Sequence, residues 1–251
     1  MLGFNGKIMV VDLSHKNFKV IEKDESYLRK YIGSALLGAA LYEELIDRND
    51  TVDPLSPENP IIFATGPMAG ANVCGATRVN ILSMAPESTG IYLSQAGGEF
   101  GPALKRAGYD ALVITGKSEI PIVLDINNAK VDFVEAGDLW GMDRVKARQQ
   151  LLADMGDDYC IASIGPAGER QVRYANIMFE PDHYAGRGGL GAVLGSKLVK
   201  AVAVRGDQEI LFKDSETVKD IKSKGGSGFA ESIKKNPRSF LGVLRHLGTY
   251  G

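Results

Sequence analysis

The chain opens with two short, largely apolar runs separated by a polar turn. Residues 7–13 and 18–21 are rich in apolar and β-branched side chains, and the turn-forming run Ser14–Asn17 lies between them. Two β-rich runs around such a turn predict a β-hairpin over Gly6–Ile21.

The pattern then changes to a broad helical stripe. Its apolar spacing predicts one helix from about Ser26 to Ile46, with Asp24 or Ser26 as the N-cap. A proline-stiffened loop follows, and the apolar run Ile61–Thr65 predicts a buried strand that ends at Gly66-Pro67.

The same order of elements returns about 100 residues later. A second predicted hairpin spans 121–134, a helix spans 143–155, and a strand spans 159–164 and ends at Gly165-Pro166. One interpretation is an internal duplication, with two similar halves packed about a pseudo-twofold axis and a ligand between them. The other is chance similarity between two hairpin–helix units.

After Gly206 the chain becomes charged and is interrupted by Gly and Ser. Short helical patterns cover Ser215–Lys224 and Phe229–Lys235. We therefore expect an α+β, β-rich domain of two similar halves with a few helices over residues 3–206. The start of a second, helical domain is expected over 207–251.

Composition and charge restrict the partners of the chain. Lys plus Arg number 29 against 31 Asp plus Glu, a net charge of −2 that argues against a nucleic-acid or membrane-surface role. No apolar run reaches the ~20 residues of a membrane span, and the first residues lack a signal-peptide pattern. The two cysteines are too few for a disulfide scaffold or a cysteine-ligated cluster. We expect a cytoplasmic protein.

Glycine is the unusual residue: 30 are present, and many cluster at 97–101 and 186–195. Gly97-Gly98 precedes a predicted helix that Gly108 ends. A glycine pair there leaves N–H groups free for phosphate or another anion. An ordinary loop is the alternative.

The second cluster satisfies G-x-G-x-x-G through Gly186, Gly188 and Gly191. The predicted strand 201–205 and a following acid (Asp207 or Glu209) resemble a dinucleotide-binding fold, so a nicotinamide cofactor stays open. Arg187 within the cluster favours a phosphate cradle over a simple turn.

Arg78 is a third candidate, because it follows the strand end at Gly66-Pro67 and arginine binds phosphate in a bidentate manner. An ordinary surface ion pair is the alternative. With three histidines and no His/Cys cluster, we predict no metal site and no catalytic residue; His183, beside the second cluster, is interpreted as structural or solvated.

These motifs resemble the N-terminal domain of the aldehyde ferredoxin oxidoreductases, over about residues 3–206. The matching runs, in chain order, are Gly6-Lys7-Ile8 with Val11-Asp12-Leu13, Leu55 to Pro60, Ala64 to Pro67, Gly97 to Gly101, Ala107 to Asp110, Ile164 to Glu169 and Ala185 to Lys197.

The resemblance implies a tungsten, or sometimes molybdenum, centre held by two molybdopterin dithiolenes near a [4Fe–4S] cluster. Members oxidise aldehydes to carboxylic acids and pass the electrons to ferredoxin. Their N-terminal domain is a β-rich base of two similar halves that carries the bis-pterin cofactor, which agrees with the duplication. The glycine clusters and arginines would then hold pterin and its phosphate.

Carried over by position, the cofactor-binding candidates are Arg78, Gln95, Gly97, Ala185, Gly186, Arg187, Gly188 and Gly189. Two positions depart from the family. Gln95-Ala96 stands where Asn-Ser is usual, and Gly33–Leu36 lacks the usual arginine.

In this family the cluster cysteines, further pterin contacts and substrate-site acids and bases lie in later helical domains. The chain is therefore expected to hold one face of the cofactor and to be inactive alone. It would need the C-terminal domains or a partner subunit that carries them, in a homo- or hetero-oligomer. The alternatives are a stand-alone pterin-binding or scaffolding subunit of a split oxidoreductase and a nicotinamide-dependent dehydrogenase.

Overall fold

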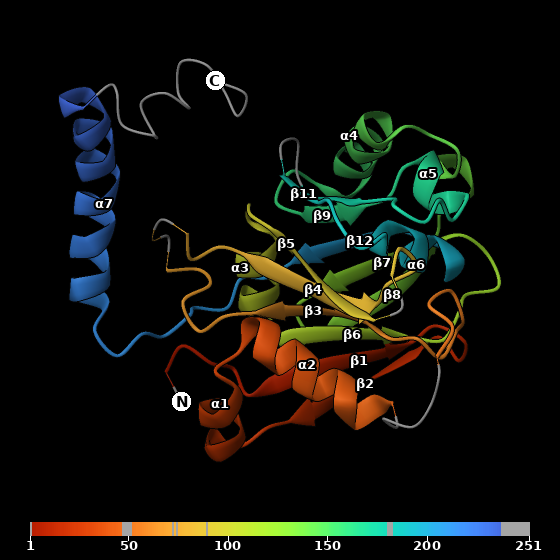
Figure 1. Cartoon of the computed structure of the whole chain (residues 1–251), viewed down its shortest axis with the longest axis horizontal. Coiled ribbons are helices and arrows are strands. Elements are labelled where there is room, and N and C mark those ends of the chain that lie inside the picture. The colour runs from red at the N-terminus through yellow and green to blue at the C-terminus, as the bar shows by residue number, and fades with distance from the viewer. Residues whose placement is uncertain are drawn as a thin grey trace.

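The chain folds around two six-stranded sheets, as a computed structural model shows (Figure 1). The structure describes residues 2–46, 52–71, 73, 75–88, 90–179 and 183–236. Helices cover the sheets and lie between them, so the predicted α+β class is confirmed.

The first half contains six strands and three helices. They are β1 (Lys7–Asp12), β2 (Asn17–Glu22), α1 (Glu25–Tyr31), α2 (Ser34–Leu45), β3 (Ile61–Thr65), β4 (Val79–Met84), β5 (Ile91–Ala96), α3 (Phe100–Arg106) and β6 (Ala111–Thr115). Both strands of the predicted hairpin form, as does the predicted strand after the proline-rich loop.

The second half follows the same plan. Its elements are β7 (Ile122–Asn127), β8 (Lys130–Glu135), the 3₁₀-helix η1 (Gly137–Leu139), α4 (Arg144–Met155), β9 (Cys160–Ser163), α5 (Pro166–Glu169), β10 (Ile177–Phe179), β11 (His183–Ala185), α6 (Leu190–Ser196) and β12 (Val199–Arg205).

The two sheets have the same topology, which confirms two similar halves. The first has the order β2-β1-β6-β3-β4-β5, and the second, from its hairpin edge, β8-β7-β12-β9-β10-β11. In each sheet the pairing of the hairpin's first strand with the last strand of the half is parallel, and the other pairings are antiparallel. The parallels seen in the sequence are therefore topological equivalents.

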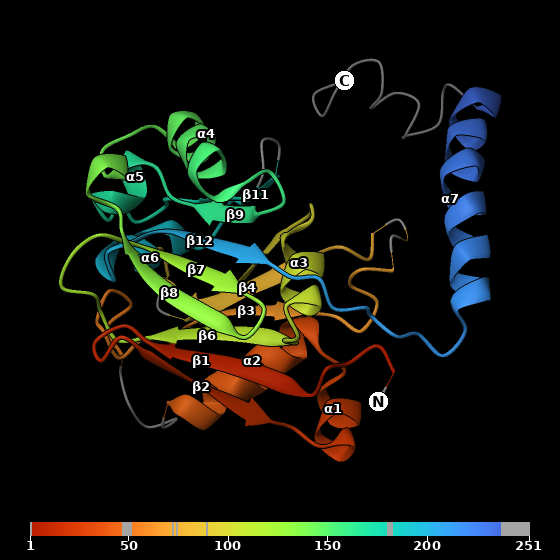
Figure 2. The same ribbon diagram turned by 180° about the vertical axis from the view of Figure 1, so that it is seen from behind.

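One core joins the halves. Side chains from both sheets, α3 and α6 form a single buried cluster, in which the rings of Phe63, Phe100 and Phe179 pack with centroids 5.1–6.2 Å apart. Two further clusters lie on the outer faces, under α2 on the first sheet and under α4 on the second. Figure 2 shows these outer helices on opposite sides of the sheets.

The single helix predicted over Ser26–Ile46 is wrong, because the chain forms two helices there. Ile32, Gly33 and Ser34 all have positive φ, at 57°, 95° and 57°. A Cβ at Gly33 would lie 2.9 Å from the carbonyl oxygen of Thr65, so the backbone passes directly against the end of β3. The predicted N-cap is confirmed: the Asp24 carboxylate accepts the N–H of Tyr27 at 2.8 Å.

The two short helical patterns near the end form one helix, α7 (Ser215–Lys235), which stands apart from the sheets in both views (Figures 1 and 2). Residues 237–251 of the predicted second domain, and Cys74, lie outside the described residues. Among the helices described, none is long and apolar enough to cross a membrane.

Candidate functional site

The duplication brings the two glycine clusters together. The first lies between β5 and α3, the second between β11 and α6, so they occupy equivalent positions in the two halves. The edge strands β5 and β11 contact each other. We call this region, residues 91–99 and 183–189, the seam.

An aromatic ring from each half packs on the glycine cluster of the other. A Cβ at Gly97 would lie 3.3 Å from Cε1 of His183 on β11, and a Cβ at Gly188 would lie 2.5 Å from Cδ1 of Tyr92 on β5. His183 is therefore part of the seam. Sequence reasoning placed His183 beside the second cluster but missed its contact with the first, because the cross-half contact exists only once the two sheets are packed.

The second glycine cluster is also held by β5 and by the turn between β4 and β5. The N–H of Gly188 donates to Oε2 of Glu87 at 2.8 Å, and the N–H of Arg187 donates to Oγ of Ser94 at 3.4 Å. A Cβ at Gly189 would lie 2.9 Å from Cγ of Pro86. The shape of this cluster thus depends on the first half.

Most glycines around α6 are explained by packing. A Cβ at Gly189 or Gly195 would lie 1.8 Å from a backbone carbonyl oxygen, and one at Gly191 would lie 2.3 Å from that of Asn176. Gly186 differs: no described heavy atom lies within 4 Å of its Cβ position, and its φ is not positive. The fold does not require glycine there, whereas close approach of a ligand to the backbone would.

Gln95 and Arg78 flank the first glycine cluster. The side-chain amide of Gln95 donates to Oδ1 of Asn80 at 2.7 Å, and the Asn80 amide donates to the hydroxyl of Ser34 at the start of α2. Arg78 immediately precedes β4, and its backbone packs on Gly101 of α3. Gln95, Gly97 and residues 185–189 therefore share the seam, with Arg78 beside the helix that begins there.

Both candidate arginines have exposed side chains. Within the described part of the chain, the guanidinium groups of Arg78 and Arg187 have no hydrogen-bond or ion-pair partner. An anionic ligand can therefore bind these guanidinium groups without the loss of an internal ion pair.

The G-x-G-x-x-G match lies in a different fold from a dinucleotide-binding domain. The strand before it, β11, is a three-residue edge strand paired antiparallel to β10. The sheet is mixed, whereas the nicotinamide interpretation depends on a doubly wound parallel sheet.

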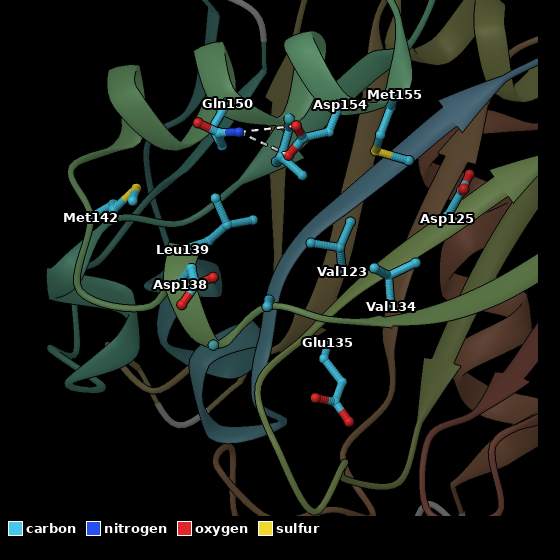
Figure 3. Close-up of a pocket in the computed structure, with 13 residues that line it drawn as sticks. Val123, Asp125, Val134, Glu135, Asp138, Leu139, Met142, Gln150, Asp154 and Met155 are labelled. Atoms are coloured by element: carbon cyan, nitrogen blue, oxygen red, sulfur yellow. Dashed lines mark hydrogen bonds between the residues drawn. The ribbon is translucent and has the colours of Figure 1, made fainter.

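A cavity of about 660 Å³ lies elsewhere, between α4 and the β7–β8 hairpin on the outer face of the second sheet (Figure 3). Its lining combines apolar side chains with carboxylates, including Asp125, whose pKa is raised by burial. None of the eight candidate residues lines it. The described residues also contain no group of three or more His, Cys, Asp or Glu side chains placed to hold a metal ion.

Comparison with known proteins matches residues 8–206 to the family described as aldehyde ferredoxin oxidoreductase, N-terminal domain. The chain is 40% identical over 217 residues to the tungsten-containing aldehyde ferredoxin oxidoreductase of Pyrococcus furiosus, which covers 86% of this chain and 36% of that protein. It is 37% identical over 220 residues to the aliphatic sulfonate oxidoreductase, WOR-like subunit, of the same organism, covering 82% of this chain and 35% of that subunit.

A solved structure has the same fold. The BamBC active site complex of benzoyl coenzyme A reductase, bound to 1,5-dienoyl-CoA, superposes with a TM-score of 0.87 and 30% identity, over 95% of this chain and 36% of that one. The chain thus spans little more than a third of the length of these relatives. By its sequence over residues 8–206 and by its two-half fold, this chain belongs to the aldehyde ferredoxin oxidoreductase family, in which it corresponds to the N-terminal domain.

Proposed function

We propose that the chain is the N-terminal cofactor-binding portion of a tungsten-dependent aldehyde:ferredoxin oxidoreductase. The complete enzyme would oxidise an aldehyde to a carboxylic acid and pass the electrons to ferredoxin. The observation that carries the proposal is the seam, where the duplication places both glycine clusters side by side and leaves Gly186 and Arg187 open. The name of the Pyrococcus furiosus relative supports tungsten.

The described residues fit an anionic, planar cofactor such as a molybdopterin. Arg187 and Arg78 would bind its phosphates, and the open backbone at Gly186 would allow close approach. Gln95 and Gly97 would contact it from the first half, and Ala185, Gly188 and Gly189 from the second. When bound, the tungsten (or molybdenum) pterin would supply a centre that takes up two electrons and releases them singly.

This chain would not complete the reaction alone. A [4Fe–4S] cluster needs four cysteine ligands, and the sequence has two cysteines. The cluster, the substrate-site acids and bases, and the ferredoxin contact would come from C-terminal domains or from a partner subunit in a homo- or hetero-oligomer.

Elemental and pterin analysis of the protein purified from its native source tests this function. We expect tungsten or molybdenum together with pterin, and iron only when cluster-bearing sequence is present. Pure protein associated with cluster-bearing sequence but devoid of both metals and of pterin would contradict the proposal.

A second candidate is a separate pterin-binding or scaffolding subunit of a split oxidoreductase. The matching structure is a complex and the sulfonate oxidoreductase relative is named as a subunit, but in each of them the matched region is about a third of one longer chain. Native purification distinguishes the candidates. A distinct iron–sulfur polypeptide that copurifies in a fixed ratio supports the split enzyme, and a single longer polypeptide containing this sequence excludes it.

A further inference from the structure

The glycine cluster at 186–189 already binds a carboxylate of the protein itself, that of Glu87. Oε2 of Glu87, on the turn between β4 and β5, accepts the N–H of Gly188 at 2.8 Å. Glu87 is exposed, and no lysine, arginine or histidine of the described residues pairs with its carboxylate. Its polar contact is therefore a backbone amide of the candidate cofactor site.

The backbone fixes the position of the Gly188 amide, whereas the Glu87 carboxylate is carried on a flexible side chain. Gly188 is buried, has a φ of +80°, and is packed against Tyr92. Glu87 reaches it from the solvent side through a side chain with three rotatable bonds. An exposed contact of this kind contributes little net free energy, so a competing anion can displace it.

We propose that Glu87 is a self-blocking group, which occupies the Gly188 amide until an anionic group of the cofactor displaces it. This inference rests on the proposed function, because it assumes that the seam receives phosphate. A phosphate near Arg187 and a carboxylate on the next residue's amide would repel each other at short range. Loading therefore requires the Glu87 side chain to swing away.

The test is a titration of the full chain with inorganic pyrophosphate, followed through the Gly188 amide signal in ¹H–¹⁵N NMR spectra. Glu87→Gln keeps a hydrogen-bond acceptor without the charge, and Glu87→Ala removes both. Glu119→Gln is the matched control, because it removes an exposed acid in the loop between β6 and β7, outside the seam. Thermal unfolding of each variant checks that the fold is retained.

We expect pyrophosphate to bind Glu87→Ala up to about fivefold more tightly than the unsubstituted chain, with Glu87→Gln between them and Glu119→Gln unchanged. Equal affinities in all four proteins would overturn the blocking role and leave the proposed function standing. Weaker binding to Glu87→Ala would also overturn it, since Glu87 would then be a supporting contact. If no protein binds pyrophosphate at Gly188, both the blocking role and the anion site fail.

Discussion

Glycine has two separable roles in the second cluster and the helix after it. Gly195 is required by packing, because a Cβ there would lie 1.8 Å from the carbonyl oxygen of Gly168, whereas the Cβ position of Gly186 faces open space. We predict that Gly195→Ala destabilises the fold by about 2–3 kcal/mol. Gly186→Ala should change stability by less than about 0.5 kcal/mol but weaken pterin or pyrophosphate binding. Urea unfolding and ligand titration of both variants measure this, and the reverse ranking would contradict it.

A buried lysine predicts a pH dependence of stability. Nζ of Lys197 donates to the carbonyl oxygens of Pro57 at 2.9 Å and Gly116 at 3.0 Å, and burial lowers its pKa from 10.5 to about 8. Between pH 8 and 10.5 the unfolded chain holds this proton and the folded chain does not, so the free energy of unfolding gains a contribution that rises with pH.

Lys197→Met is the reference that isolates this contribution, since the other titrating groups are common to both proteins. The free energy of unfolding of the unsubstituted chain minus that of the variant should be constant below pH 8 and increase up to pH 10.5. Urea titrations at a series of pH values provide the comparison. A difference that stays flat would show that the amine has an ordinary pKa in the folded chain, and one that falls with pH would show a raised pKa.

At the scale of the element, the break between α1 and α2 stores backbone strain. Ile32 ends α1 with a φ of 57°, a left-handed conformation that is costly for a β-branched residue, and its side chain is 57% exposed. We predict that Ile32→Gly raises the free energy of unfolding by up to about 1 kcal/mol. Leu36→Gly is the control, because Leu36 is equally exposed but lies inside α2; it should lower stability by about 1 kcal/mol. Equal losses in both variants would argue against strain at Ile32.

Sequence patterns predicted the elements that form because of residues within the same short segment. The hairpins, α4 and the buried strands β3 and β9 have clear apolar runs or periods and turn residues. The strands β4, β5, β10 and β11 went unpredicted: β5 is exposed at several positions, and β10 and β11 have three residues each. Their pairing and the cross-half contacts of Tyr92 and His183 depend on the assembled fold. The glycine clusters were therefore visible in the sequence, but the seam was not.

At the scale of the molecule, the shared core predicts that both halves unfold together. Phe63 of the first half and Phe179 of the second contact each other, and both are fully buried. The sole tryptophan, Trp140, lies in the second half. We predict that Phe63→Leu lowers the free energy of unfolding measured by Trp140 fluorescence by about 1–2 kcal/mol, as Phe179→Leu does. If Phe63→Leu leaves the Trp140 transition unchanged, the halves are independent units.

The central claim is that the seam between the halves binds a metal pterin. The most direct measurement is anomalous X-ray diffraction, at the tungsten and molybdenum edges, from crystals of the protein isolated with its cofactor. We predict one metal peak, with pterin density that contacts Gly186 and Arg187 on one side and Gln95 and Gly97 on the other. Metal and pterin bound away from these residues, for example in the cavity under α4, would contradict the account.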